Sequence, residues 1–107
     1  MAEIQKSRVL HLTDVLQFQP GAVVSRTLIN QKAGTITLFA FAKDEELSEH
    51  TAPYDASAHV LEGEMEITIT GNRYRLNTGD IIIMPANQPH ALRAITSSKM
   101  LLVMIRS

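Results

Sequence analysis

The chain has 107 residues, of which 45% are hydrophobic and 20% charged, and its 10 basic and 11 acidic side chains leave a net charge of −1. This length suits one hydrophobic core, so we expect a single domain over residues 1–107. A balanced charge gives no electrostatic reason to expect nucleic acid or an anionic membrane surface as a partner. Because cysteine is absent, the sequence excludes a disulfide scaffold, a thiolate metal site and a cysteine nucleophile.

The sequence predicts neither a membrane span nor export. The longest uninterrupted apolar stretch, residues 100–105, has six residues, whereas a helix that spans a bilayer needs about 20. The first ten residues, MAEIQKSRVL, lack the apolar region and the small-residue cleavage site of a secretory signal. We therefore expect a soluble, cytoplasmic protein.

The first part of the chain predicts a helical turn and two strands. Thr13 or Asp14 is the expected N-cap of the helical turn. Val, Ile and Thr, whose branched side chains favour strands, make up 25 of the 107 residues. The expected elements are a helical turn at 13–18, strands at 22–29 and 35–41 with a turn around 32–34, and an exposed acidic connection at 44–46.

The clearest strand signal lies at residues 64–70, where E-M-E-I-T-I-T alternates strictly between polar and apolar residues. This period of two indicates a strand with one buried face. Gly and Asn at 71–72 predict a two-residue turn, and residues 73–76 then form the second strand of a hairpin. The side chains expected to be buried are those of Met65, Ile67 and Ile69.

The remainder of the chain predicts further short strands. Pro85 and Pro89 bound a loop, because proline cannot donate to a sheet ladder. The strand at 99–106 is apolar on both faces, which indicates a second layer of burial such as a homodimer. The expected elements are a turn at 77–80, a strand at 81–84, a loop at 86–89, a strand at 90–95, a turn at 96–98 and a strand at 99–106. Many short strands separated by Gly or Pro predict one all-β sandwich or barrel.

Two of the four histidines lie where strands meet loops. His50 follows the acidic connection, and His90 follows the loop between the two prolines. Both positions are expected at the mouth of the β structure. His11 lies outside any motif and is expected to be structural.

Around His90 the sequence resembles the cupin family. The second cupin motif runs Gly, five residues, Pro-x-Gly, two residues, His, three residues, Asn. Gly79, Pro85 and His90 match it, with Asn87 at the position of its second glycine. V-L-E-G-E at residues 60–64 resembles the end of the first cupin motif. The resemblance covers about residues 34–106 and implies an all-β cupin barrel, a double-stranded β-helix of the jelly-roll type.

The first cupin motif runs Gly, five residues, His-x-His, three or four residues, Glu, six residues, Gly. Counting back from Gly63 places its two histidine positions at His50 and Ala52, and its glutamate position at Ala56. Metal-binding cupins present three His and one Glu to Mn, Fe, Ni or Zn. This chain therefore keeps two of the four usual ligands, and whether it binds a metal stays open.

His59 is the candidate for a third metal ligand, with Glu49 or Asp55 as a carboxylate. If Ala56 points into the barrel, strand alternation turns His59 outward. A β-bulge between the two residues would turn His59 inward. The two interpretations, a metal ligand and a packed histidine, both stay open.

The resemblance implies a small-molecule-binding barrel, but a fold does not determine function. In one hypothesis His50 and His90, with His59 as a possible third ligand, hold a divalent transition metal (Mn, Fe, Ni or Zn) that acts as a Lewis acid in an enzyme. In the other, the same histidines bind a polar ligand without metal and without catalysis. Catalytic residues and the substrate are not identified by the sequence. Because dimers are frequent in the family, the resemblance also implies a homodimer.

Overall fold

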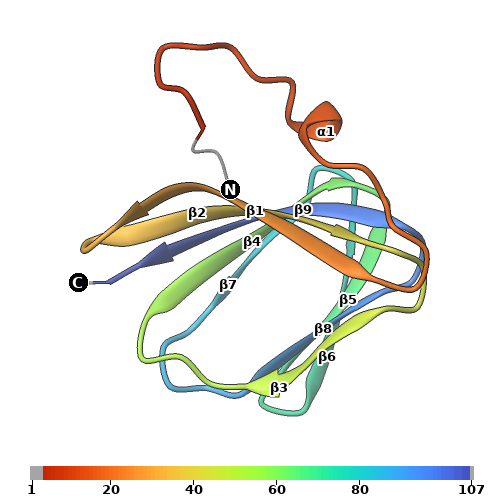
Figure 1. The fold of residues 1–107 in the computed structure, drawn as a ribbon. Coiled ribbons are helices and arrows are strands. Elements are labelled where there is room, and N and C mark those ends of the chain that lie inside the picture. The colour runs from red at the N-terminus through yellow and green to blue at the C-terminus, as the bar shows by residue number, and fades with distance from the viewer. Residues whose placement is uncertain (1–3, 107) are drawn as a thin grey trace.

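The computed structural model describes residues 4–106 as two antiparallel β-sheets that face each other, with one short helix before them (Figure 1). The elements are α1 (Leu12–Val15), β1 (Val23–Gln31), β2 (Gly34–Phe41), β3 (Glu46–His50), β4 (Asp55–Glu62), β5 (Glu64–Ile69), β6 (Asn72–Asn77), β7 (Ile81–Met84), β8 (His90–Ala94) and β9 (Ser98–Ile105). The five-stranded sheet has the order β1-β2-β9-β4-β7, and the four-stranded sheet has the order β3-β8-β5-β6. The predicted all-β jelly-roll barrel is confirmed.

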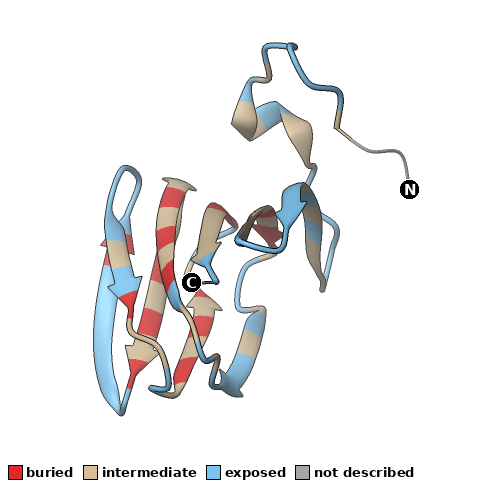
Figure 2. Ribbon diagram, turned by 90° about the vertical axis from the view of Figure 1, so that its left-hand side faces the viewer, coloured by how far each residue is buried: buried red, intermediate tan, exposed pale blue. Residues whose placement is uncertain are grey.

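The core lies between the two sheets and consists of the inward-facing residues of most strands (Figure 2). The prediction that the apolar residues of β5 are buried is confirmed, since Met65 and Ile67 are fully buried and Ile69 is 7% exposed. Complete burial of one such side chain stabilises a fold by about 1.5–3 kcal/mol. The other fully buried members of the core are Phe41, Ala58, Val60, Ala94 and Met100.

The hairpin between β5 and β6 turns one residue earlier than predicted. Ile69 pairs with Asn72, so the turn consists of Thr70 and Gly71 rather than Gly71 and Asn72. Both turn residues have positive φ, 48° and 79°, which is the requirement of the tight turn that matches the twist of paired strands. The earlier turn keeps the apolar side chains of both strands on the inner face.

The predicted helical turn also differs from the structure at its start. α1 begins at Leu12, and its N-cap residue is His11, which makes no side-chain capping bond. The prediction of Thr13 or Asp14 as N-cap is therefore wrong, because both lie inside the helix. Lys99 Nζ on β9 donates a hydrogen bond to the carbonyl of Thr13, and this tertiary contact attaches the helix to the five-stranded sheet.

The acidic connection is shorter than predicted, because Glu46 already belongs to β3 and pairs with Arg93 of β8. β3 is an edge strand, and four of its five residues are exposed. Such a strand carries little apolar alternation for a sequence pattern to detect. It matters for function because it ends at His50.

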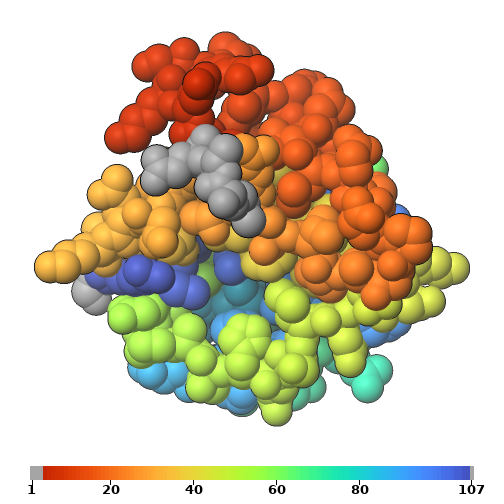
Figure 3. All heavy atoms as spheres, viewed as in Figure 1, coloured from red at the N-terminus to blue at the C-terminus, as the bar shows by residue number. Residues whose placement is uncertain are grey.

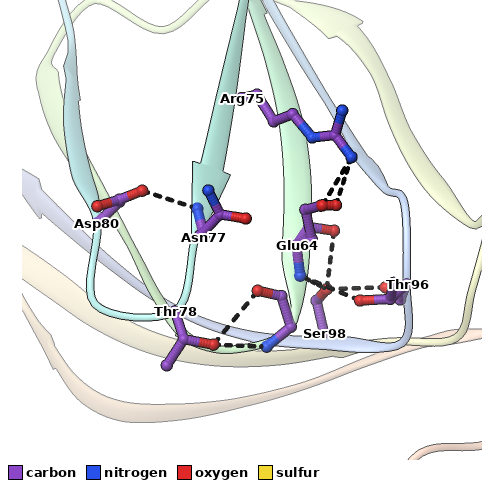
Figure 4. Close-up of polar contacts among 8 residues, drawn as sticks. Glu64, Arg75, Asn77, Thr78, Asp80, Thr96 and Ser98 are labelled. Atoms are coloured by element: carbon purple, nitrogen blue, oxygen red, sulfur yellow. Dashed lines mark hydrogen bonds and ion pairs between the residues drawn. The ribbon is translucent and has the colours of Figure 1, made fainter.

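A polar cluster closes the end of the barrel where β5 begins (Figure 4). The Gly63 amide donates to Thr78 Oγ1 at 3.0 Å, and the Glu64 amide donates to Ser98 Oγ at 3.0 Å. The Glu64 carboxylate pairs with Arg75 at 2.5 Å and raises the pKa of that guanidinium, chiefly through this hydrogen bond. Because this cluster lies at the first residue of β5, the last residue of the strand, Ile69, lies at the opposite end of the barrel.

Within residues 4–106, no helix is long and apolar enough to cross a membrane.

Candidate functional site

His50 and His90 converge at the end of the barrel away from the polar cluster. They are 40 positions apart in sequence, yet they lie directly opposite each other on β3 and β8, and His90 also pairs with Ile69. Their Nε2 atoms are 3.1 Å apart, and the two rings meet edge to face at 71°. The prediction that these two histidines come together is confirmed.

An irregularity in β3 brings the two histidines into register. Glu46 pairs with Arg93 and Leu47 with Leu92, and continuing this register would place His50 opposite Pro89. Proline has no N–H to offer a ladder. The register instead shifts by one residue between Leu47 and His50, so that His50 opposes His90 and both side chains lie on the same face of the sheet.

The loop before His90 is attached to the structure on both sides. The Asn87 amide donates to the carbonyl of Ala52 at 2.7 Å, and the Ala86 amide donates to the Asp55 carboxylate at 2.8 Å. On the other side, the Thr70 amide donates to the carbonyl of Pro89 at 2.8 Å. These bonds hold the first residue of β8 in place.

Asn87 explains how the chain departs from the second cupin motif, in which glycine is usual at this position. Its φ is +66°, in the left-handed region that Asn tolerates better than most other side chains. The loop therefore keeps the conformation that a glycine would provide.

Backbone carbonyls orient both imidazole rings. His50 Nδ1 lies 2.8 Å from the carbonyl of Ser48, and His90 Nδ1 lies 3.3 Å from the carbonyl of Gln88. Because a carbonyl can only accept, a ring bonded in this way carries a proton on Nδ1, and in its neutral form it presents a lone pair on Nε2. At 3.1 Å the two Nε2 atoms are within hydrogen-bond distance, so a proton shared between them, or another cation, is favoured over two facing lone pairs.

The environment of His90 favours its neutral form. Its side chain is 6% exposed, and this burial lowers its pKa, with a further decrease from the neighbouring charge of His50. The bond to the Gln88 carbonyl opposes the shift without reversing it. Neutral imidazole is the form that binds metals.

The pair fits two positions of a metal coordination shell. Bonds from zinc to imidazole nitrogen are about 2.0–2.1 Å long, and two of them span the observed Nε2 separation of 3.1 Å. Ring nitrogens that bind metals almost always have the other N–H fixed by a carbonyl or carboxylate, as found here for both rings. Among residues 4–106, no group of three or more His, Cys, Asp or Glu side chains is placed to hold a metal.

The structure does not bring His59 to the pair. The residues flanking it, Ala58 and Val60, are fully buried in the core, so His59 points to the outer face of its sheet. The pairing of β4 is regular from Asp55 to Val60, and its one irregularity follows at Glu62. The bulge that would turn His59 inward is therefore missing, and strand alternation determines its direction.

The two alanines at the remaining motif positions provide no ligand. Ala56 is 4% exposed and belongs to the core, which places this motif position inside the barrel as expected. Ala52 lies in the connection between β3 and β4 and contributes only its carbonyl, to Asn87. The metal-binding capacity of this end is therefore that of the two imidazoles.

Apolar side chains accompany the pair on the inner face. Ile69 lies opposite His90, and Ala56 lies between Met84 and Met104 on the facing sheet. Figure 3 shows a hollow between the orange and gold atoms of the β1–β2 hairpin and the yellow-green atoms of the segment around residue 50. Two surface cavities, of about 540 and 450 Å³, lie elsewhere and include neither histidine.

The supporting contacts of the pair were not predicted from the sequence. Ser48 and Gln88 act through their carbonyls, which every residue possesses, so the residue type carries no signal. Thr70 donates through its amide and places its hydroxyl 3.1 Å from Gln88 Oε1. Placing the hairpin turn at Thr70 and Gly71 would have identified Thr70 as a neighbour of this loop. The sequence alone does not place the turn there, because its position follows from the register of β5 and β6.

A family model for the cupin domain matches residues 37–106. The chain belongs to the cupin family. By motif spacing in the sequence, His50 and His90 match two ligand positions of the cupin motifs, and Ala52 and Ala56 match the other two.

Solved structures agree with this assignment. A conserved protein of unknown function from Streptococcus pyogenes is 37% identical, with a TM-score of 0.92 over 100% of this chain and 96% of that one. A cupin superfamily protein from Desulfitobacterium hafniense is 27% identical, with a TM-score of 0.91 over 99% and 97% of the two chains. A cupin 2 conserved barrel domain protein from Leptotrichia buccalis is 36% identical, with a TM-score of 0.87 over 90% of this chain and 47% of that one. No curated protein matches the chain.

Proposed function

We propose that this cupin holds a divalent transition metal between His50 and His90 and presents it to a small molecule at the mouth of the barrel. The observation that carries the proposal is the pair of Nε2 atoms 3.1 Å apart, with both Nδ1 atoms bonded to carbonyls. A cation removes the repulsion between two lone pairs directed at each other. Mn, Fe, Ni and Zn all accept imidazole ligands.

Different residues would bind the metal and orient its ligands at this site. His50 and His90 hold the metal, while the carbonyls of Ser48 and Gln88 keep both rings in the binding tautomer. A metal bound there supplies Lewis-acid chemistry to a ligand that occupies its open positions. The buried Ile69, next to His90, limits the access of water from the barrel interior.

A metal-free binding module is the second candidate, and the missing third ligand among the described residues favours it. In that case the two Nε2 atoms act as hydrogen-bond acceptors. They would select a ligand with a hydroxyl or ammonium donor, because a carboxylate would face two more acceptors. The two candidates therefore differ in whether binding of the small molecule needs a metal.

Metal analysis of protein purified without a histidine tag tests the proposal. We expect about one equivalent of a transition metal, or binding of Zn²⁺, Mn²⁺, Ni²⁺ or Fe²⁺ in calorimetric titration at about pH 7.5, where imidazole is largely neutral. His50→Ala and His90→Ala should each remove most of this binding.

Two matched variants serve as controls. His11→Ala and His59→Ala remove an imidazole far from the pair and should leave metal binding unchanged. Less than about a tenth of an equivalent of metal, together with no binding in titration, would leave the metal-free module as the function. Equal binding by wild type, His50→Ala and His90→Ala would place the metal elsewhere and overturn the proposal.

A further inference from the structure

The N-terminal arm, residues 4–18, covers one edge of the five-stranded sheet. Lys99 on β9 donates a hydrogen bond to the carbonyl of Thr13, and its Nζ lies 4.9 Å from the ring centre of Phe18. Leu38 on β2 is fully buried although it does not belong to the barrel core, as expected for a residue beneath the arm. The rest of the arm stands away from the barrel (Figure 2).

A cavity of about 540 Å³ lies between this arm and β1. Its volume is within the range of roughly 300–1,000 Å³ that is usual for small-molecule sites. The partly buried side chains of Ile4, Leu10 and Val15 form an apolar part of its lining. Neither His50 nor His90 borders the cavity, so the metal site proposed above does not account for it.

The charged groups that border the cavity are mainly cationic. Arg8 of the arm and Arg26 of β1 line it together with the imidazole of His11, and Asp14 is the one carboxylate among the described lining residues. No ion pair within residues 4–106 joins Asp14 to either arginine. Two guanidinium groups against one carboxylate leave an excess of one positive charge, in a chain whose net charge is −1. The lining therefore favours a monoanion.

Arg26 provides a second, independent indication of a ligand. It lies opposite Leu38 in the sheet, and its Nε atom is buried without a hydrogen-bond partner among residues 4–106. Every other buried side-chain nitrogen or oxygen of the part-buried and buried residues in this range has a partner. Unpaired buried donors destabilise a fold and are rare in native proteins. An acceptor group on a molecule in the adjoining cavity would satisfy this donor.

We propose that the cavity binds a small organic carboxylate with an aliphatic body, whose carboxylate accepts hydrogen bonds from Arg26. A guanidinium group is planar, and two N–H groups along one of its edges match a carboxylate. The apolar lining contacts the aliphatic part of the ligand, and Arg8 adds a second positive charge. Because Nε of Arg26 is buried, binding to it requires a movement of this side chain or of the arm beside it.

Titration of isotope-labelled, metal-free protein with sodium hexanoate, followed by amide NMR spectra, tests the proposal. Metal-free protein is needed because hexanoate would also bind a metal at the His50–His90 pair. Hexanamide is the neutral analogue with the same chain, and inorganic phosphate is an anion without one. We expect the amide signals of residues 4–18 and of β1 to shift and to saturate below about 10 mM hexanoate. The dissociation constant of hexanoate should be at least about tenfold lower than those of hexanamide and phosphate.

Three variants locate the site. Arg26→Met keeps an aliphatic side chain but removes the charge and the N–H groups, and it should raise the dissociation constant of hexanoate at least about tenfold. Arg73→Met is the matched control, because it removes an exposed arginine from the other sheet, and it should bind like wild type. Arg8→Met changes an exposed residue of the arm, so it provides a second variant should Arg26→Met fail to fold. It should weaken binding about threefold.

Each outcome of these titrations supports or overturns the proposal. Saturable binding of hexanoate that depends on Arg26 and not on Arg73 supports it. Absence of saturation over this range of concentration, or equal binding by wild type and the arginine variants of the cavity, would overturn it. Hexanamide binding as tightly as hexanoate would mean an apolar cavity that does not recognise charge. Phosphate binding as tightly would mean a site for inorganic anions, and either result overturns the proposal.

Discussion

Replacement of Gly63 by alanine gives a direct measure of how tightly the polar end of the barrel is packed. Gly63 has φ +97°, and a Cβ there would lie 2.6 Å from the carbonyl oxygen of Ser97 and closer still to Ser98 Oγ. Neither contact is possible without movement, and Ser98 is fully buried. The hydroxyl of Ser98 also accepts the Glu64 amide hydrogen bond at 3.0 Å.

Two contributions make up the expected loss of unfolding free energy. Holding a residue other than glycine in this sparsely populated backbone region costs of order 1–3 kcal/mol. Displacing Ser98 weakens the hydrogen bonds that its fully buried hydroxyl makes with the amide and the carbonyl of Glu64, and an unpaired buried polar group costs about 1–3 kcal/mol. We therefore expect Gly63→Ala to lower the free energy of unfolding by about 2–6 kcal/mol, a large part of the roughly 5–15 kcal/mol typical of a folded domain.

Gly79→Ala separates the two contributions. Gly79 has nearly the same φ, +93°, but no atom lies within 4 Å of the position that a Cβ would take there, so this variant carries only the backbone cost. Urea unfolding followed by circular dichroism should show Gly63→Ala less stable than Gly79→Ala by about 1–3 kcal/mol. Equal stability of the two variants would refute the argument that contact with Ser98 determines the cost. Metal binding should survive both changes, because His50 and His90 lie at the other end of the barrel.

The remaining predictions concern the loop and the histidine at the mouth. Asn87→Gly should change the free energy of unfolding by less than about 0.5 kcal/mol, whereas Asn87→Val should lower it by about 1–2 kcal/mol, because a β-branched residue is disfavoured at positive φ. Urea unfolding of both variants measures this difference. Equal free energies of unfolding for the two variants would contradict the prediction. Burial lowers the pKa of His90 below its ordinary 6.5, so the unfolded chain binds more protons than the folded chain as the pH falls through 6.5. Metal-free protein should therefore be most stable above pH 6.5 and lose stability as the pH falls through and below this value. His90→Gln should flatten this decrease between about pH 7.5 and 5.5 in the same unfolding assay, and an unchanged slope would assign it to other groups.

The order of residue types along the chain was sufficient to predict much of the barrel. Strict alternation over residues 64–69 predicted which side of β5 faces the core, because successive side chains of a strand point to opposite faces whatever the partner strand is. Motif spacing likewise predicted that His50 and His90 meet, although they are 40 positions apart. Both inferences rest on residue types in a fixed order along the chain.

Tertiary structure decided what depends on register. Whether Thr70 or Asn72 takes part in the hairpin turn follows from which residues of β5 and β6 oppose each other, and sequence permits both. β3 escaped prediction because, as an edge strand with four exposed residues, it is defined by pairing with β8 rather than by its own pattern. The attachment of α1 likewise could not be read from its own pattern, because it involves Lys99, a residue 86 positions away from Thr13.

The functional site shows the same division between sequence and tertiary structure. The sequence determined that two histidines remain at the cupin ligand positions and that alanines occupy two others. Only the tertiary structure decided that both Nδ1 atoms meet carbonyls, that both Nε2 atoms face each other, and that His59 lies outside the barrel. Side-chain direction depends on where β-bulges fall, and a one-residue shift in a strand moves a side chain from one face to the other. The shift occurs in β3 before His50 and in β4 only after His59, so the first histidine joins the pair and the second lies on the outer face.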